Sequence, residues 1–268
     1  MKKITSSVYT FEDIIKDEFL YVDKTEFIWS LISQGKAMYF LSRPRRFGKS
    51  LTVSTLKAVF QGKKELFKGL AIYDKPYDWK PYPVIHLDMG NCQAKTPEEL
   101  NNFLFDTLTS LAEEHNMQLR GQSNATRFEF LIEDIAKKNP VVILLDEYDK
   151  PILNTLTAPE AMACRDVLKG FYSSIKKCES RERFVFVTGA TKFCHVSLFS
   201  DLNNLTDITM NRDYATMFGY TQEEFETYFV DRIDSACKQL DMSREKLLQE
   251  IKAWYDGYRF HAKAESVY

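Results

Sequence analysis

Three consecutive residues, Gly48, Lys49 and Ser50, have the side chains that a phosphate-binding loop requires. They follow a short apolar run, Ala37 to Leu41, and precede a segment with helical periodicity. Backbone N–H groups at the start of a helix attract phosphate, and a glycine lets the backbone approach it closely. Lysine would place a positive charge near the β and γ phosphates, and serine would offer a hydroxyl to Mg²⁺. The sequence therefore predicts a nucleotide phosphate site at residues 43–51.

The first half of this loop departs from the usual pattern G-x-x-x-x-G-K-[ST]. Arg43 stands where the first glycine is expected, and Pro44 has no N–H to donate to a phosphate. A basic turn that contains Gly-Lys-Ser by chance is therefore a competing interpretation. We nevertheless assign the whole loop to nucleotide binding. Its residues are Arg43, Pro44, Arg45, Arg46, Phe47, Gly48, Lys49, Ser50 and Leu51.

Two carboxylates at the end of another apolar segment favour the nucleotide interpretation. Asp146 and Glu147 directly follow Val141 to Leu145, a short aliphatic run that is typical of a buried strand. Ligands of α/β sheets bind where parallel strands end. We expect Asp146 to hold Mg²⁺ together with Ser50, and Glu147 to orient the attacking water. An acidic turn is common by itself, but its occurrence after such a strand and together with Gly-Lys-Ser is much less common.

A third apolar segment, Phe184 to Thr188, ends in hydroxyls and a cation. We expect it to lie between the other two strands, with Thr188 as a sensor of the γ-phosphate. Local hydrogen bonding of these hydroxyls within a turn is an equally good interpretation. Lys192 is a further candidate to neutralise charge in the transition state, but Arg45 and Arg46 are preferred to it. The predicted catalytic residues are Glu147, Lys49 and Thr188.

The order of apolar and periodic segments predicts how these residues are positioned. The expected strands are Ala37 to Leu41, Val84 to Leu87, Val141 to Leu145, Phe184 to Thr188 and Thr206 to Thr209. The expected helices are Lys24 to Ser33, Lys49 to Phe60, Pro97 to Glu114, Thr126 to Lys138 and Pro159 to Lys177. Alternating strands and helices predict right-handed crossovers and a mostly parallel sheet covered on both faces. The fold class is therefore α/β with three layers.

The pattern after the fifth expected strand contains only helices. Thr221 begins a capping-box sequence, and a second helix is expected from Ser243 to Trp254, ended by Asp256 and Gly257. We expect residues 1–218 to form the nucleotide-binding core and residues 219–268 to form a helical lid. The aromatic residues from Trp254 to Phe260 are interpreted as the core of this lid rather than as a platform for nucleic-acid bases.

Composition and charge exclude several other classes of protein. The net charge of -2 over 268 residues creates no global field that would attract nucleic acid or an anionic membrane. No apolar run is long enough to cross a bilayer, and charged residues interrupt the N-terminal segment, which argues against a signal peptide. The five cysteines are scattered, so no zinc site is predicted, and Cys194 beside His195 is interpreted as a coincidence. We expect a cytoplasmic protein with no membrane partner.

Several separated segments resemble the predicted AAA-ATPase-like family. They are Phe19 to Thr25, Arg43 to Ser50, Leu145 to Pro151, Leu202 to Thr209 and Trp254 to Phe260. The resemblance extends over nearly the whole chain. It implies a P-loop ATPase of the additional-strand class with sheet order 5-1-4-3-2, and it makes Arg43 the usual residue at its position. It also implies that ATP and Mg²⁺ are the cofactors.

The resemblance further implies a larger protein. Members of the family commonly continue into a domain similar to PD-(D/E)XK nucleases, and the chain ends at Ser266 to Tyr268, where a further segment is expected. We therefore expect a truncated lid and an effector domain C-terminal to it, and we assign no nuclease site within these residues. The leading hypothesis is Mg²⁺-dependent binding and hydrolysis of ATP by the motor or switch module of that protein. The alternative is a nucleotide-gated switch with little turnover of its own, and contact with nucleic acid stays open.

Overall fold

The computed structural model describes residues 2–155, 159–192, 198–199, 204–255 and 257–268. At its centre lies a sheet of five strands: β1 (Ala37–Ser42), β2 (Val84–Asp88), β3 (Val141–Asp146), β4 (Glu182–Gly189) and β5 (Thr206–Asp207). All four strand pairings are parallel. The strand order is β2-β3-β4-β1-β5, which is the predicted order 5-1-4-3-2 counted from the opposite edge. The predicted α/β fold class is confirmed.

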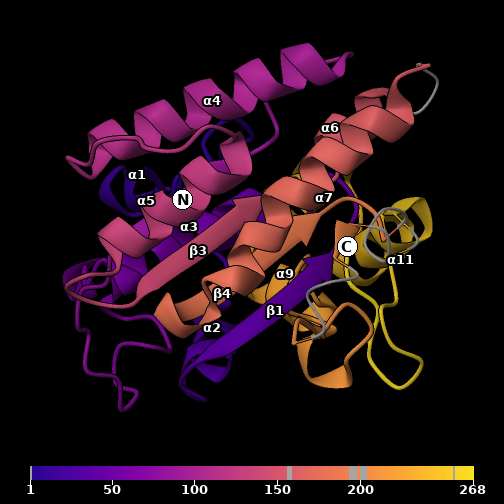
Figure 1. Cartoon of the computed structure of the whole chain (residues 1–268). Coiled ribbons are helices and arrows are strands. Elements are labelled where there is room, and N and C mark those ends of the chain that lie inside the picture. Colours follow the sequence, from indigo (N-terminus) through magenta and orange to yellow (C-terminus); the bar gives the residue numbers. More distant parts are fainter. Residues whose placement is uncertain (1, 156–158, 193–197, 200–203, 256) are drawn as a thin grey trace.

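Helices cover both faces of the sheet, as Figure 1 shows. On one face lie α1 (Phe11–Lys16), α2 (Thr25–Ile32) and α3 (Lys49–Phe60). On the other face lie α4 (Pro97–Glu114), α5 (Asn124–Ile135), α6 (Lys150–Thr155) and α7 (Ala161–Lys177). Every residue of β3 is buried, and alternate residues of this strand enter the two hydrophobic cores. A strand buried on both faces must be apolar throughout, which is why its sequence shows a continuous aliphatic run.

Short elements complete the described part of the chain. Three 3-10 helices are η1 (Lys64–Phe67), η2 (Glu179–Arg181) and η3 (Arg212–Tyr214). Three C-terminal helices follow: α9 (Gln222–Tyr228), α10 (Val230–Leu240) and α11 (Arg244–Tyr255). In Figure 1 the yellow C-terminal segment lies beside the end of β1. Within the described residues we find no helix whose length and apolar character would let it span a membrane.

Side-chain caps begin two helices, and the one at Thr221 confirms a start signal predicted from the sequence. The Thr96 side chain accepts a hydrogen bond from the backbone N–H of Glu99 at 3.2 Å, which caps α4. Thr221 and Glu224 form a reciprocal capping box at the start of α9. These side chains satisfy backbone N–H groups that have no partner within the helix. Caps of this kind depend on residues only three positions apart, so the sequence reveals them directly.

One expectation about the C-terminal part is wrong. Trp254 and Tyr255 do not form a lid core, because they are 85% and 71% exposed. The reason is that α11 buries only Leu247, so the far end of the helix faces solvent. Asp256 of the predicted end signal and part of the Leu202 to Thr209 segment lie outside the described residues. Cys194 and His195 lie outside them as well.

Backbone and side-chain contacts join the C-terminal helices to the sheet. Tyr220 and Tyr268 exchange two backbone hydrogen bonds, of 3.1 and 2.9 Å. Lys24, just before α2, donates to the carboxylate of Glu224 in α9 and to the carbonyl of Thr216. The last described segment therefore returns to the start of the predicted lid. The division into residues 1–218 and 219–268 remains a prediction.

Candidate functional site

The loop between β1 and α3 curves tightly around its own lysine. Gly48 caps α3 with a φ of 88°, and Arg46 has a φ of 67°, so both residues adopt the left-handed conformation. The buried Lys49 Nζ donates to the backbone carbonyls of Arg43 and Pro44, each at 3.1 Å. Burial lowers the pKa of this lysine, while the charge of Glu147 acts in the opposite direction. The ammonium group therefore lies inside the loop, where a phosphate would approach.

The Arg43 side chain does not contact Lys49 as its backbone carbonyl does; it binds elsewhere in the fold. Its guanidinium is buried and donates to the carbonyl oxygens of Ser42, Thr209 and Tyr214, at 2.9, 2.7 and 3.2 Å. Its Cζ lies 3.9 Å from the centre of the Phe260 ring, and burial lowers its pKa to about 10. This side chain holds the C-terminal part of the chain and is not available to neutralise a phosphate. What remains of the prediction for this residue concerns its backbone.

The remaining loop residues separate into exposed cations and a packed ring. Arg45 and Arg46 are exposed, and the charge of Arg45 contributes to the lowered pKa of Lys49. The half-buried Phe47 ring contacts the rings of Tyr258 and Phe260 edge-on, with centroids 4.9 and 5.7 Å apart. The loop thus presents its arginines to solvent while its aromatic residue packs on the chain's last segment.

The start of α3 approaches the end of β3. The Ser50 hydroxyl lies close enough to the carboxylate of Asp146, which is 2% exposed, to lower the pKa of that carboxyl. The pKa of Asp146 is raised to about 6. Burial is the largest cause, the charges of Asp88 and Glu147 act in the same direction, and Ser50 and Lys49 act against it. The two residues predicted to share Mg²⁺ are therefore brought together.

Glu147 follows with an unusual backbone conformation. Its φ is 52°, and its N–H donates to Oδ1 of Asp146 at 3.0 Å. A residue other than glycine rarely adopts this left-handed conformation, and backbone strain of this kind clusters at functional sites. The turn directs Glu147 into the same cavity as Lys49 and Ser50.

The sequence analysis missed a third carboxylate, Asp88, at the end of β2. In the strand register Asp88 pairs with Asp146, and its Oδ1 accepts from the N–H of Gly90 at 2.8 Å. A side chain at Gly90 would meet that oxygen at 2.9 Å and Oε2 of Glu147 at 3.1 Å. The available signal was that Asp88 directly follows the predicted strand Val84 to Leu87, at the same edge of the sheet.

Thr188, the predicted sensor, lies next to Asp146 across the sheet. Leu145 pairs with Val187, so Asp146 and Thr188 are the next residues along these two strands. The Thr188 Oγ1 is buried and has no hydrogen-bond partner among the described residues. Thr188 lines neither of the two cavities described below, and its catalytic role stays a prediction.

The turn after β3 also holds the segment that follows β4. The buried Asp149 accepts hydrogen bonds from the N–H groups of Ala190 and Thr191, at 3.2 and 2.8 Å, and from the hydroxyl of Thr191 at 2.9 Å. Lys192, a weaker candidate for the site, instead forms an ion pair with Asp207 at 2.6 Å. Asp149 is a further residue that the sequence alone did not identify, although it belongs to the segment Leu145 to Pro151.

Two adjacent cavities flank the loop. One, of about 440 Å³, is lined by Arg46, the residues from Gly48 to Leu51, and Glu147. The N-terminal segment forms its other wall, through Thr5, Ser6, Val8 and Tyr9. No sequence pattern had connected that segment with the site. We call this space the phosphate cavity.

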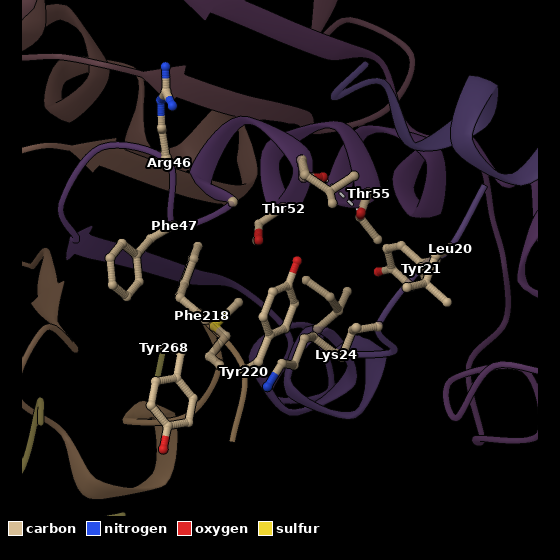
Figure 2. Close-up of a pocket in the computed structure, with 16 residues that line it drawn as sticks. Leu20, Tyr21, Lys24, Arg46, Phe47, Thr52, Thr55, Phe218, Tyr220 and Tyr268 are labelled. Carbon is tan, nitrogen blue, oxygen red and sulfur yellow. Dashed lines mark hydrogen bonds between the residues drawn. The ribbon is translucent and has the colours of Figure 1, made fainter. Parts of the chain in front are cut away.

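The second cavity, of about 160 Å³, lies along α3 (Figure 2). Figure 2 shows Thr52 of α3 and the ring of Tyr220 facing one another across it, with Phe47 and Tyr268 at one side. Arg46, Gly48 and Leu51 line both cavities. The two cavities therefore border the same residues of the loop, and we call the second one the side cavity.

The site's donor atoms fit Mg²⁺ bound together with a nucleotide. Ser50 and Asp146 supply a hydroxyl and a carboxylate oxygen, which are ligands that Mg²⁺ prefers. Among the described residues, no group of three or more His, Cys, Asp or Glu side chains is arranged to hold a metal ion. Mg²⁺ usually binds through one or two protein ligands plus water and substrate phosphates. The arrangement matches that mode rather than a site built entirely from protein.

The chain is similar to a known family and to a longer curated protein. Residues 6–199 match the AAA-ATPase_like family, described as predicted AAA-ATPase. An uncharacterized protein encoded in the vnfD 5′ region of Azotobacter chroococcum mcd 1 is 39% identical over 268 residues. That alignment covers 98% of this chain and 50% of the relative. The chain therefore spans about half the length of the curated relative that it matches.

A solved structure offers a more distant comparison. It is the Aeropyrum pernix ORC2 protein in its ADPNP–ADP complexes, with a TM-score of 0.43 and 14% sequence identity. The alignment covers 87% of this chain and 53% of that protein.

Proposed function

The chain belongs to the AAA-ATPase-like family of predicted AAA-ATPases, and from that premise we propose that it binds ATP with Mg²⁺ and hydrolyses the nucleotide. The chain spans half of a longer relative, so we assign this activity to the motor or switch module of a larger cytoplasmic protein. An effector domain C-terminal to residue 268 would use the energy or respond to the switch.

The placement of Ser50 beside Asp146 carries this proposal: Ser50 is close enough to lower the pKa of that carboxyl, and it lines the same cavity as Glu147. This placement brings a hydroxyl and a carboxylate side by side at the start of α3, although they come from distant parts of the chain. Bound Mg²⁺ would supply positive charge that neutralises the phosphate oxygens. Ser50 and Asp146 would hold the ion, and Asp88 adds negative charge nearby without being needed as a ligand.

Lys49 and Glu147 would serve different steps, Lys49 in binding the phosphates and Glu147 in their hydrolysis. Lys49 donates to two loop carbonyls, and it can exchange these acceptors for phosphate oxygens without leaving the loop. Glu147 lines the same cavity and can accept a hydrogen bond from a water that attacks the γ-phosphate. Binding of the phosphates and turnover would therefore depend on different side chains.

The nucleoside would lie in the side cavity. This cavity shares Arg46, Gly48 and Leu51 with the phosphate cavity, so a nucleotide can continue from one into the other along α3. The rings of Tyr220 and Phe47 provide apolar walls, and Thr52 provides a hydroxyl. Small-molecule sites typically combine apolar walls with a few polar groups in this way.

Nucleotide titration and a phosphate-release assay test the proposal on the protein and two variants. Lys49→Ala should lose nucleotide affinity by at least about tenfold, since it removes a charged hydrogen-bond donor. Glu147→Gln should keep Mg²⁺–ATP affinity within a few-fold and lose most turnover. The exposed Lys68 and Glu65 offer matched controls, because Lys68→Ala and Glu65→Gln make the same chemical changes away from the cavities.

The outcomes separate the two candidate functions. Binding with turnover that depends on Glu147 supports the ATPase, whereas tight binding with negligible turnover supports the nucleotide-gated switch. Absence of nucleotide binding by the unmodified protein in the presence of Mg²⁺ would contradict both. Unchanged hydrolysis by Glu147→Gln would remove the role assigned to that carboxylate. Titrations of ATP and GTP in parallel define the base preference.

A further inference from the structure

The cations around the phosphate cavity are unequal in their availability. Arg43 is buried on backbone carbonyls and an aromatic ring. Lys192 is paired with Asp207. Lys49 already lies within the loop, where it faces the phosphates. A nucleoside triphosphate bound with one Mg²⁺ still carries negative charge on its terminal phosphate, so a further cation would stabilise it.

Arg46 has the placement that such a cation requires. It lines the phosphate cavity together with Lys49 and Glu147, the residues assigned to the phosphates and to the attacking water. In Figure 2 its guanidinium extends away from the rings of the side cavity. Its side chain is exposed, and within the described part of the chain it forms no hydrogen bond or ion pair. Nothing therefore has to be broken before it binds a ligand.

The backbone conformation of Arg46 supports a role for its side chain. Its φ is 67°, and at such an angle a glycine is favoured because it has no Cβ to clash with the backbone. An arginine here costs conformational free energy that a glycine would avoid. Strained residues of this kind persist where the side chain serves a function.

We propose that Arg46 contacts the terminal phosphate of the bound nucleoside triphosphate, directly from the phosphate loop. The inference rests on the proposed function and specifies how the site distinguishes a triphosphate from a diphosphate. The planar guanidinium can donate to two phosphate oxygens at once. Because Arg46 lines the same cavity as Glu147, it reaches the end of the phosphate chain at which water would attack.

The test compares Mg²⁺–ATP and Mg²⁺–ADP affinities of Arg46→Gly, Arg46→Gln and Arg46→Lys by calorimetric titration. Arg46→Gly should keep or raise the Tm, because glycine favours the left-handed conformation. Both Arg46→Gly and Arg46→Gln should lower ATP affinity by about tenfold to a hundredfold, the loss typical of a charged hydrogen bond. ADP affinity should change by less than about threefold, and Arg46→Lys should fall in between, since it keeps the charge but not the planar fork.

Arg181→Gln is the matched control. Arg181 is exposed in η2, directly before β4 and therefore at the opposite end of the sheet from the loop, and its substitution should change neither affinity. If the unmodified protein binds no nucleotide, the proposed function fails and this inference fails with it. If it binds ATP and the Arg46 variants bind ATP equally well, only the role of Arg46 is overturned. Equal losses for ATP and ADP would overturn the assignment to the terminal phosphate.

Discussion

Three carboxylates converge where β2 and β3 end, and their surroundings give them different chemistry. Asp146 is the most deeply buried, and Ser50 lies close enough to lower its pKa. Asp88 accepts from the backbone of Gly90, so it shapes the turn. Glu147 lines the phosphate cavity. Like charges this close disfavour simultaneous ionisation, which is one reason that Asp146 holds its proton unusually well.

The raised pKa of Asp146 predicts a pH dependence of metal binding. Its pKa is raised from 3.8 to about 6, so below pH 6 the carboxyl is protonated and cannot coordinate Mg²⁺. We expect Mg²⁺–ATP affinity to fall about tenfold for each pH unit below 6 and to level off above pH 7. Calorimetry between pH 5 and 8 measures this. Asp106→Asn, at an exposed position, should leave the profile unchanged.

The raised pKa of Asp146 also predicts how the stability of the nucleotide-free protein depends on pH. A folded-state pKa above the unfolded value means that the native protein binds more protons between these two values. The contribution of Asp146 is therefore complete below about pH 4 and is lost as pH rises through 6. Asp146→Asn should remove this dependence from denaturant unfolding curves. If the free energy of unfolding of this variant still changed with pH in the same way, the pH dependence could not be assigned to Asp146.

At the scale of elements, two tight turns at neighbouring strand ends position the carboxylate of Glu147. The turn after β2 contains Gly90, and the turn after β3 begins with Glu147 in the left-handed conformation. The two turns approach so closely that a Cβ on Gly90 would lie 3.1 Å from Oε2 of Glu147. The position of the Glu147 carboxylate therefore depends on a glycine in another turn.

Gly90→Ala should separate binding from turnover. The new methyl group would displace the carboxylates of Asp88 and Glu147, and a misplacement of about 1 Å can reduce a rate about a hundredfold. We expect at least a tenfold loss of turnover with Mg²⁺–ATP affinity changed only a few-fold. Steady-state phosphate release and nucleotide titration measure the two quantities.

Gly170→Ala provides the control for that substitution. Gly170 lies within α7, and a Cβ there would meet nothing within 4 Å. This variant should keep full activity and gain about 0.5–1 kcal/mol of stability, because alanine favours the helix. If Gly90→Ala turned over ATP as fast as Gly170→Ala, the proposed link between the two turns would be wrong.

The elements themselves were predictable to different degrees. The helix from Lys49 to Phe60 and the helix from Pro97 to Glu114 have the predicted bounds, because long amphipathic segments repeat their pattern several times. The six-residue helices α1 and α6 were not predicted, since a pattern of one or two turns cannot be distinguished from a loop. The segment after Thr221 contains two helices, divided at Phe229.

At the scale of the whole molecule, the chain's last segment packs on the nucleotide loop. Phe47 contacts the rings of Tyr258 and Phe260, and Arg43 stacks on Phe260 while it binds the carbonyl of Thr209. These contacts join the loop to residues that lie far from it in sequence. If nucleotide binding moved the loop, these contacts would also move the segment around Tyr258 and Phe260.

Arg43→Gly restores the general P-loop pattern, yet we expect it to destabilise the protein. The substitution leaves buried carbonyls without their donor and removes the side chain that stacks on Phe260. The free energy of unfolding should fall by about 3 kcal/mol or more, measured by denaturant titration. Arg46→Gly should lose no stability. Equal stability of the two variants would contradict the distinction between these arginines.

The amino-acid sequence by itself determined the alternation of strands and helices, and it located the loop at Gly48 to Ser50 and the carboxylates at Asp146 and Glu147. These features are predictable because they depend on local periodicity, on turn residues and on side-chain chemistry at short spacing. Parallel strands that end at one edge of a sheet then bring the two segments together. The strand order came from the family resemblance, and the structure confirms it.

Only the tertiary structure decided which of several similar side chains lines the phosphate cavity. Arg43 and Arg46 have the same chemistry, but one is buried on the carbonyls of residues 209 and 214 and the other is free above the cavity. Asp88 and the N-terminal segment join the site for the same reason, through contacts between distant elements. Such partners depend on how the layers pack, and a linear pattern contains no record of that packing.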